Sequence, residues 1–504
     1  MKNLTGKHVL VLGLGHSGLA LARWCARCGA VVTVADTRAN PPQLEAMNSA
    51  IEAAVFVHSD MSAELLDQAA FSMVLKSPGL SPASIADVTA AALARGIPCG
   101  NELTLFIQAL NDLKAQVAEC PGYNPQVIGI TGTNGKTTVT SLAGRLIQRS
   151  GKSVAVAGNI GPTLLDTLSE KLDTDCLPEV WVLELSSFQL DAVTNFEPAA
   201  AVVLNVTQDH LDWHQTLANY SAAKANVFGR TGLMLLNRQD AVVMSALPVA
   251  IKGKMPRTVL TFGTDEPRRA GEYGIETVNG MAWLVRASEA DETIKRKRGQ
   301  PEDIVDLHIQ RLMPVDALRI HGLHNAANAL AALALAHAVG CALGPMLHGL
   351  REYRGEAHRV ESVAVVEGVE YFDDSKGTNV GATVAAITGL GTQRKLVLIL
   401  GGEGKGQDFS PLVLPVSRYV RAAVLIGRDA PQIRLQLEQS GVCLLAAASM
   451  QEAVELAAQQ AQTGDAVLMS PACASFDMFE NYEHRARIFC EAVQTLAIEH
   501  GVVV

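Results

Sequence analysis

The hydrophobic and polar positions of the chain alternate between short apolar stretches and longer amphipathic ones. HVLVLG at residues 8–13 and VVTVAD at 31–36 enclose the helix-period stretch LALARWCARCG, which is the pattern of a βαβ unit. The same alternation starts again at QVIGIT (126–131) and at EYFDDS (370–375). The pattern predicts an α/β fold with doubly wound sheets, which bind ligands at the carboxyl ends of their strands.

The length of 504 residues corresponds to about three domains of roughly 150 residues each. The first unit ends near Gly100, and the polar stretch 111–125, which closes with Pro-Gly and Asn-Pro, is typical of a connector. We expect a Rossmann-like domain at 1–100, a central domain with a P-loop ATPase-like parallel sheet at 101–354, and a second Rossmann-like domain at 355–504.

Composition and charge exclude several classes of protein. With 48% hydrophobic and 18% charged residues, the chain has the composition of a folded, soluble α/β protein. Its net charge of −10 argues against nucleic acid as a partner, because a protein that tracks phosphates needs a basic face. The basic cluster KRKR at 295–298 lies among acidic residues, so we expect a solvated insertion loop there.

The chain also lacks signs of export. Its N-terminal sequence enters an apolar strand without the pattern of a secretory signal. The longest apolar stretch, 329–336, is far shorter than the roughly 20 residues that span a bilayer and fits a buried helix. We expect a cytoplasmic protein with no membrane partner. Cys25 and Cys28 form a CxxC motif without the second pair of a zinc site, so no metal or redox role is assigned to them.

The strongest functional motif is a glycine-rich loop between a strand and a helix. GTNGKTT follows QVIGIT and precedes VTSLAGRLIQR, the context in which backbone N–H groups bind phosphate oxygens. Lys136 is positioned to contact the transferred phosphoryl group, and the Thr137 hydroxyl to bind magnesium. Ile130 stands where the general motif has its first glycine, so this is a variant loop. The candidate ATP-binding residues are Gly132, Thr133, Asn134, Gly135, Lys136, Thr137 and Thr138.

A second nucleotide motif opens the chain. Gly13, Gly15 and Gly18 follow the first strand, and Asp36 ends the second, which fits the dinucleotide-binding fingerprint. Alone, this motif would favour a nicotinamide oxidoreductase. The phosphate loop in the next domain changes that interpretation, because a small Rossmann-like unit can bind any pyrophosphate, including that of a UDP-sugar.

Several motifs together resemble those of the Mur ligase family, in order and in spacing. They are GTNGKTT, GNIG (158–161), ELSSFQL (184–190), NVTQDHLDWH (205–214), AAKANVF (222–228) and HNAANALAALA (324–334). The resemblance implies an ATP-dependent enzyme that builds the peptide stem of peptidoglycan, in cell-wall biogenesis. It also implies that the first domain binds UDP.

Other motifs narrow the resemblance within that family. GLGHSG, SPG (77–79), DDSKGTN (373–379), GGEGKGQDF (401–409) and SPACASFDMF (470–479) are similar to those of the members that add D-glutamate to UDP-N-acetylmuramoyl-L-alanine. The stretch 287–305 is an insertion outside the family pattern. Ligation of another amino acid, a nicotinamide oxidoreductase and an ATP-driven motor stay as alternatives, and we expect a monomer.

The resemblance also implies roles for individual residues. Near the reacting carboxylate and phosphate it places Lys136, Asn159, His210 and Lys224. Two magnesium ions are expected, with ligands from Thr137, Glu184, His210 and Lys224, where Lys224 carries a carbamate formed with carbon dioxide. Hard oxygen ligands suit magnesium. The spacing of His321, His324 and His358 fits no metal site.

The remaining implied contacts bind the three substrates. ATP is also contacted by Asn325, Arg359 and Asp374. The UDP moiety is bound by His16, Ser17, Asp36, Thr37, Arg38, Ser77, Pro78 and Gly79. D-glutamate is bound by Lys376, Thr378, Lys405, Ser475 and Tyr482, where Tyr482 stands in place of the phenylalanine frequent in the family.

Overall fold

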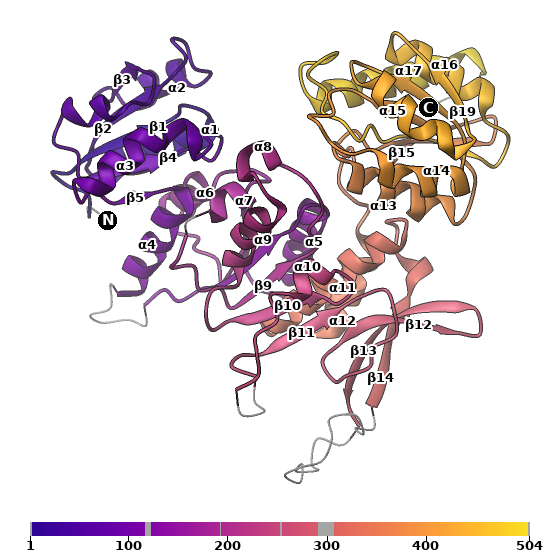
Figure 1. Cartoon of the computed structure of the whole chain (residues 1–504). Helices are drawn as coiled ribbons and strands as arrows, with labels where there is room; N and C mark the ends of the chain where they lie inside the picture. Colours follow the sequence, from indigo (N-terminus) through magenta and orange to yellow (C-terminus); the bar gives the residue numbers. More distant parts are fainter. Residues whose placement is uncertain (1–2, 116–121, 192, 252–254, 291–306, 502–504) are drawn as a thin grey trace.

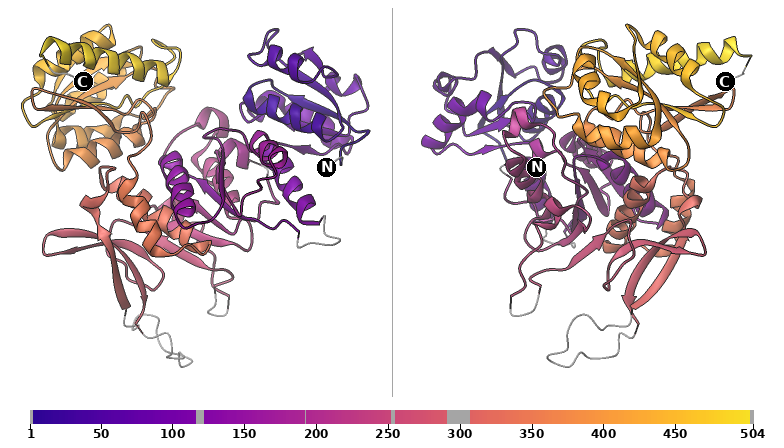
Figure 2. Two further views of the ribbon diagram at one scale, coloured as in Figure 1. Left: turned by 180° about the vertical axis from the view of Figure 1, so that it is seen from behind. Right: turned by 45° about the vertical axis from the view of Figure 1, so that its right-hand side comes forward.

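The computed structural model describes residues 3–115, 122–191, 193–251, 255–290 and 307–501. These residues form three sheets, each in a domain of its own, and Figures 1 and 2 show the first and third domains as separate lobes on the same side of the central one. The expected three-domain α/β fold is confirmed. None of the described helices is long and apolar enough to cross a membrane.

The first sheet is parallel throughout, in the order β3-β2-β1-β4-β5. Its elements are β1 (His8–Leu12), α1 (His16–Arg27), β2 (Val31–Asp36), α2 (Leu44–Ala50), β3 (Val55–His58), β4 (Met73–Lys76), α3 (Ala86–Ala94) and β5 (Cys99–Gly100). The glycines of the first turn have a steric role. A Cβ on Gly18 would lie 1.9 Å from the Gly13 carbonyl oxygen, so only glycine allows α1 to pack this closely on the turn.

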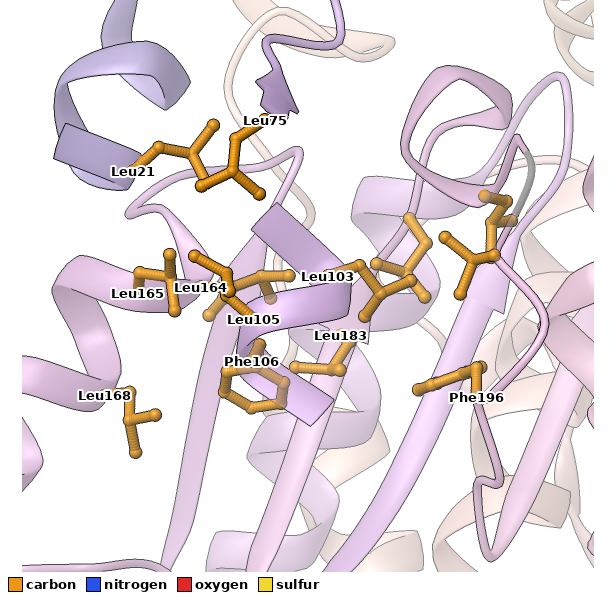
Figure 3. Close-up of a cluster of buried hydrophobic side chains, with 14 of the residues drawn as sticks. Leu21, Leu75, Leu103, Leu105, Phe106, Leu164, Leu165, Leu168, Leu183 and Phe196 are labelled. Carbon is orange, nitrogen blue, oxygen red and sulfur yellow. The ribbon is translucent and has the colours of Figure 1, made fainter. Parts of the chain in front are cut away.

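The first domain is joined to the central one through a shared hydrophobic core. Helix α4 (Glu102–Ala115) leaves the first sheet and packs against α6 (Leu164–Asp173) of the central domain. Figure 3 shows Leu75 of the first sheet above Leu103 and Phe106 of α4. The Phe106 ring meets Trp181 edge-on, with 5.1 Å between ring centroids. The position of the first domain therefore depends on apolar packing as well as on polar contacts.

The central sheet has nine strands among the described residues, in the order β14-β13-β12-β11-β10-β9-β6-β8-β7. Its strands are β6 (Gln126–Thr131), β7 (Val154–Gly158), β8 (Val180–Glu184), β9 (Ala200–Val203), β10 (Leu233–Asn237), β11 (Val259–Phe262), β12 (Tyr273–Val278), β13 (Met281–Glu289) and β14 (Leu307–Pro314). Its other helices are α5 (Lys136–Arg149), α7 (Ser187–Leu190), α8 (Leu211–His214), α9 (Leu217–Ala225), α10 (Ala241–Met244), α11 (Leu323–Ala338) and α12 (Leu343–Glu352). The stretch 329–336 is part of α11 and is fully buried, as expected.

The central sheet differs from the expected parallel sheet at one edge. It is parallel from β7 to β12, but β13 and β14 are antiparallel. For β12 and β13 the cause is the two-residue turn Asn279-Gly280, in which both residues have positive φ, 51° and 80°. Such a turn matches strand twist and makes a tight hairpin. Of the predicted insertion at 287–305, only residues 287–290 are described. The rest, including the KRKR cluster, lies outside the described residues.

The third sheet has the order β15-β16-β20-β17-β18-β19, and only its edge strand β15 is antiparallel among the described strands. Its strands are β15 (Glu361–Val366), β16 (Val369–Asp373), β17 (Leu396–Gly401), β18 (Val420–Ile426), β19 (Cys443–Ala446) and β20 (Ala466–Met469). Its helices are α13 (Val380–Gly391), α14 (Val413–Tyr419), α15 (Ala430–Leu437), α16 (Met450–Gln460) and α17 (Tyr482–Glu499). The carboxyl ends of β16, β17 and β20 lead into the three motifs predicted to bind substrate.

Candidate active site

The phosphate loop joins β6, which lies between β9 and β8 in the central sheet, to α5. Gly135 has φ +84°, a left-handed conformation that favours glycine, and turns the chain into the N-terminus of α5. The Lys136 ammonium donates to the carbonyl oxygens of Gly132 and Thr133, both at 2.9 Å. Burial lowers the pKa of Lys136, and the Glu184 carboxylate opposes that shift. The phosphate loop thus combines the Lys136 ammonium with the N-terminus of α5, and both favour an anion.

Asn205 fixes the shape of the phosphate loop from the end of the neighbouring strand. Its side-chain oxygen accepts from the Asn134 backbone N–H at 2.8 Å, and its amide donates to the Asn134 carbonyl at 3.1 Å. The sequence interpretation missed this role, although Asn205 is the first residue of the NVTQDHLDWH motif. Only the neighbouring position of β6 and β9 reveals it.

Glu184 and Asn159 lie together because β7 and β8 are parallel neighbours with Gly158 opposite Glu184. Glu184 is 1% exposed, and its Oε1 accepts from the Asn159 amide at 2.8 Å. Its Oε2 is buried without a hydrogen-bond partner among the described residues. A buried carboxylate oxygen without a partner destabilises the folded protein unless a cation or a hydrogen-bond donor binds it. The pair therefore fits a hard metal ion.

Lys224 is buried in the central domain behind the loop, at 1% exposure. Its ammonium donates to the Gly132 carbonyl at 2.9 Å and lies 4.4 Å from the centre of the Tyr220 ring. It forms no ion pair with a carboxylate of the described residues. Burial, aided by the Lys136 charge, lowers its pKa well below the ordinary value. The structure therefore favours the neutral amine of Lys224.

His210 precedes α8 in a left-handed conformation, with φ 52°. Its Nε2 lies 3.7 Å from the Asp209 carboxylate, and its ring meets Phe188 edge-on, with 4.8 Å between ring centroids. Burial lowers the pKa of His210, while Asp209 raises it and the lysines lower it further. The structure thus brings His210 close enough to Lys136 and Lys224 for their charges to affect its ring.

The third domain contacts the phosphate loop directly. The Arg359 guanidinium donates to the Thr137 hydroxyl at 2.7 Å. Asn379 and Asn134 exchange amide hydrogen bonds of 3.1 and 3.3 Å, and Asn379 also reaches Asp209 at 3.4 Å. Asn379 was not predicted as a site residue, although it ends the DDSKGTN motif.

A cavity of about 380 Å³ lies between the central and third domains. Of the predicted ATP contacts, it is lined by Asn134, Gly135, Thr138, Asn325, Arg359 and Asp374. Asn325 is held there by its own bonds, since its amide donates to the His321 carbonyl and its oxygen accepts from Asn328. Asn237, Gln239 and Asn328 also line the cavity and were not predicted. Asn237 ends β10 and Gln239 follows it, and neither belongs to a motif, whereas Asn328 lies within the HNAANALAALA motif but was not singled out.

The third-domain residues divide into two neighbouring groups. Burial raises the pKa of Asp374 to about 7, and Ser470 donates to its carboxyl group at 2.7 Å. The Lys376 ammonium lies 3.4 Å from the centre of the Tyr482 ring, and burial, aided by Arg359, lowers its pKa to about 8. Thr378 is half-buried beside it, and its backbone N–H donates to the Lys376 carbonyl.

Lys405 and Ser475 lie on the second group of loops. Glu403 and Ala474 exchange backbone hydrogen bonds of 2.9 Å, which ties the GGEGKGQDF loop to the SPACASFDMF loop. Ser475 is 3% exposed, and the Lys405 ammonium lies 6.0 Å from the centre of the Phe476 ring. Among the described residues no hydrogen bond joins Lys405 to Lys376, so the two cations lie on separate loops.

His358 begins the third domain and makes a local cluster. Its Nδ1 lies 2.6 Å from a carboxylate oxygen of the buried Asp373, and its backbone N–H donates to Glu361 at 2.9 Å. Ligand-type atoms of these three residues lie within 4.8 Å of one another. Because the carboxylates already accept from His358 itself, the cluster serves to fix the backbone next to Arg359. The spacing of histidines along the sequence did not reveal this grouping.

In the first domain, Asp36 is the centre of the predicted UDP site. Burial alone would raise its pKa, but hydrogen bonds from Arg38 and from the Leu14 backbone lower the pKa to about 2. The ionised carboxylate thereby fixes Arg38 and the glycine turn together. Ser77 lies against that turn, since a Cβ on Gly13 would be 3.1 Å from the Ser77 side chain.

The other predicted UDP contacts surround this centre. His16 is exposed at the start of α1, with its ring nitrogen 3.3 Å from the Gln43 amide, and Ser17 follows it, half-buried. The Thr37 carbonyl contacts the His58 ring nitrogen at 3.1 Å. Pro78 and Gly79 continue the loop after Ser77. The structure brings this set together at the carboxyl ends of β1, β2 and β4, away from the phosphate loop.

A phosphate loop, a buried carboxylate beside it and a cavity shared with a cation-bearing domain define a multidomain nucleotide-dependent enzyme. Three family models match in chain order: a Mur ligase MurD-like N-terminal domain at 7–100, a Mur ligase middle domain at 130–336 and a Mur ligase glutamate ligase domain at 358–473. The chain belongs to the Mur ligase family.

Curated relatives agree over the full length. The chain is 62% identical to the UDP-N-acetylmuramoylalanine--D-glutamate ligase of Albidiferax ferrireducens, over 99% of this chain and 98% of the relative. It is 57% identical to the ligase of the same name from Polaromonas sp., with 100% of each chain covered.

Solved structures of more distant proteins share the fold. A UDP-N-acetylmuramate-alanine ligase from Thermotoga maritima matches with a TM-score of 0.55 at 19% identity, covering 97% of this chain and 99% of the other. The MurF ligase of Thermotoga maritima, solved with ADP, matches with a TM-score of 0.56 at 15% identity, covering 98% of this chain and 97% of the other.

Proposed function

We propose that this enzyme joins D-glutamate to UDP-N-acetylmuramoyl-L-alanine at the expense of ATP, in the synthesis of peptidoglycan precursors. Relatives that are 57% and 62% identical over nearly the whole chain carry the name of that ligase. The structural observation that supports it best is the cavity in which the phosphate loop meets Arg359, Asp374 and Lys376 of the third domain.

The chemistry follows from the difficulty of amide formation in water. One oxygen of the alanyl carboxylate attacks the γ-phosphorus of ATP, the bond to the bridging oxygen breaks, and ADP leaves. The amine of D-glutamate then attacks the acyl carbon of the resulting acyl phosphate. Phosphate leaves, and the neutral amine nitrogen loses one of its two protons and keeps the other as the N–H of the new amide. Lys136 and Arg359 lie where cations offset the charge on the phosphoryl group during the first step.

We assign magnesium to the face shared by Thr137, Glu184, His210 and Lys224. The buried Oε2 of Glu184, which has no partner among the described residues, and the Thr137 hydroxyl of the phosphate loop are hard oxygen donors, so these residues fit the ion. Magnesium, when bound, offsets negative charge between the two anionic reactants. Asn159 then holds Glu184 in orientation through its amide. Two ions are expected, the second held with the help of a modified Lys224.

We further propose that Lys224 is carbamylated. Its neutral amine attacks the carbon of CO₂ and releases a proton. The product is an anionic N-carboxylate, at a position where a protonated lysine would carry a positive charge. The burial of Lys224, its lack of a carboxylate partner among the described residues and its lowered pKa favour the neutral amine that this addition needs. An anion there would also remove the repulsion from Lys136.

The substrate subsites complete the proposal. UDP contacts His16, Ser17, Asp36, Thr37 and Arg38 and the loop 77–79, whereas D-glutamate contacts Lys376, Thr378, Lys405, Ser475 and Tyr482. Lysine ammonium groups suit the two carboxylates of D-glutamate. The domain limits 1–100, 101–354 and 355–504, the cytoplasmic location and the monomeric state stay predictions.

The test is phosphate release from ATP with magnesium and UDP-N-acetylmuramoyl-L-alanine, across D-glutamate, L-glutamate, L-alanine and diamino acids. Release that depends on D-glutamate, with the ligated product detected by mass, is the expected result. Release only with another amino acid would move the assignment within the family. No release with any amino acid would contradict the proposal.

A further inference from the structure

A second set of contacts links the first domain to the segment that carries His210. Lys76 is the last residue of β4 and immediately precedes the 77–79 loop. Its ammonium pairs with the Asp191 carboxylate of the central domain at 3.0 Å and lies 5.7 Å from the centre of the Trp213 ring. The side chains of Lys76 and Asp191 are only 17% and 30% exposed. Solvent therefore screens this pair less than it screens an exposed one.

Trp213 belongs to the short helix that follows His210. The backbone N–H groups of Trp213 and His214 donate to the His210 carbonyl at 3.2 and 3.0 Å. A displacement of Trp213 would therefore alter the left-handed conformation at His210. Figure 1 shows this helix, α8, on the side of the central domain that faces the other two.

The opposite side of α8 is anchored within the central domain. A ring nitrogen of His214 lies 2.9 Å from the Ser187 hydroxyl, and the Phe188 ring packs against His210, Trp213 and His214. Asp191 directly follows these α7 residues, and its backbone N–H donates to the Ser187 carbonyl. Lys76 thus contributes a charged group of the first domain to a cluster formed by α7, Asp191 and α8.

We propose that Lys76 is a positioning residue, which couples the seating of the UDP-binding domain to the conformation of His210 through Asp191 and Trp213. The inference rests on the proposed ligation for its kinetic readout. The 77–79 loop of the proposed UDP site begins at the residue after Lys76. A UDP moiety bound to this loop would therefore be one residue along the chain from the Lys76–Asp191 ion pair. Part of the binding energy of the UDP moiety is then used to orient the reacting end of the substrate.

The chain offers a matched control at the same domain boundary. Arg27 pairs with Asp173 of α6, with a shortest N–O distance of 2.6 Å, but these side chains are 39% and 59% exposed and α6 does not carry His210. Removing this pair changes domain attachment without touching α8. Lys76→Met and Arg27→Met therefore separate coupling to His210 from general domain docking.

The kinetic test measures kcat and the KM of each substrate for Lys76→Met, Lys76→Arg, Asp191→Asn, the Lys76→Met/Asp191→Asn double variant and Arg27→Met. We expect Lys76→Met and Asp191→Asn each to lower kcat about tenfold, the scale of a partly desolvated ion pair with a cation–π contact. Lys76→Arg should restore kcat to within about threefold of wild type, because arginine also pairs and stacks. The double variant should lose no more than the worse single one.

The spectroscopic test does not depend on turnover. The difference in emission between wild type and Trp213→Phe isolates the Trp213 signal, and UDP is added as the probe. We expect UDP to change this signal in the Lys76-containing protein and not in Lys76→Met. If wild type fails to ligate D-glutamate, the proposed function fails while this measurement still tests the coupling.

Four results would overturn the proposal. They are an unchanged kcat in Lys76→Met, a rise confined to the KM of the UDP substrate, an equal loss of kcat in Arg27→Met, and additive losses in the double variant. The second would make Lys76 a direct substrate contact, and the third would reduce its role to domain docking. Thermal unfolding of each variant shows whether a loss comes from misfolding.

Discussion

The guanidinium of Arg359, from the first residues of the third domain, donates a hydrogen bond of 2.7 Å to the hydroxyl of Thr137 in the phosphate loop. The two residues are 222 positions apart in the sequence. Their contact places a cation from one domain at the candidate magnesium ligand of another. The candidate phosphoryl-transfer site therefore draws residues from both domains.

The first prediction concerns this cation. Arg359→Ala should lower kcat about 10²- to 10³-fold, the usual cost of removing one group that stabilises transition-state charge. Arg359→Lys should recover only part of the loss, because an ammonium group cannot contact Thr137 and a phosphate in the same planar geometry. Phosphate release dependent on D-glutamate measures both. Arg351→Ala, on the exposed face of α12, is the control and should retain full activity.

The second prediction concerns Glu184. Glu184→Gln keeps an oxygen for the Asn159 amide but removes the negative charge, so the magnesium concentration for half-maximal activity should rise at least about tenfold. The thermal midpoint without magnesium should stay equal or rise, because the amide removes a buried charge that lacks a full set of partners. An unchanged magnesium requirement would remove Glu184 from the metal site. Glu455→Gln, an equivalent substitution on the exposed face of helix α16, is the control and should leave the magnesium requirement unchanged.

The third prediction tests the carbamate on Lys224. Protein equilibrated with ¹³CO₂ should show a carbamate carbon resonance by NMR that is absent in Lys224→Arg, since the guanidinium stays protonated and does not add to CO₂. Lys224→Arg should also lose most activity. Because burial lowers the pKa of Lys224 and so increases the fraction of neutral amine, the resonance should weaken as acid protonates the amine. A wild-type protein without the resonance but with full activity would contradict this assignment.

The fourth prediction is a pH dependence of D-glutamate binding. The pKa of Lys376 is lowered to about 8, so its ammonium is present below that pH and is lost above it. The KM for D-glutamate should therefore rise as the pH increases past about 8, by up to about tenfold per unit, and Lys376→Met should abolish this dependence. Tyr482→Phe should stay within about threefold of wild type, because the ring face next to Lys376 is retained.

Much of this site follows from local sequence. GTNGKTT is recognisable because a phosphate loop needs its glycines and lysine at fixed positions between a strand and a helix, and parallel strand ends bring motifs to one edge. The roles of Asn205 and Asn379 require knowledge of which strands and domains are neighbours. The pairing of Asp36 with Arg38 is local, but the hydrogen bond from the Leu14 backbone to Asp36 joins the turn after β1 to the end of β2 and is a tertiary feature.

Two further structural features were not predicted from the sequence. The antiparallel edge of the central sheet is signalled by Asn279-Gly280, but the apolar pattern around that turn is weak, because β12 and β13 are only partly buried. The contact of Lys76 with Asp191 and Trp213 has no local signature. It arises because hydrophobic packing through α4 sets the first domain against α7 and α8.

The last prediction concerns Glu102, a buried carboxyl group at the junction of the first and central domains. It is 1% exposed, its Oε1 accepts from the Leu165 backbone at 3.0 Å, and its Oε2 has no partner among the described residues. Burial raises its pKa from 4.5 to about 7, opposed by the backbone N–H groups of α6 and aided by Asp166. Below pH 4.5 both folded and unfolded states are protonated, so the group costs nothing there. As the pH rises, the unfolded chain ionises first, and folding stability falls until the pH exceeds about 7.

Glu102→Gln mimics the neutral form, so it should leave the thermal midpoint unchanged below about pH 4.5, raise it increasingly between about pH 4.5 and 7, and keep a constant gain above that range. The gain in unfolding free energy should reach at most about 3 kcal/mol, the energy of the shift in pKa. Glu45→Gln, exposed on α2, should show no such trend. A midpoint difference between Glu102→Gln and wild type that does not vary with pH would mean that Glu102 stays ionised in the folded protein. In that case the α6 N-terminus, rather than protonation, stabilises the buried carboxylate.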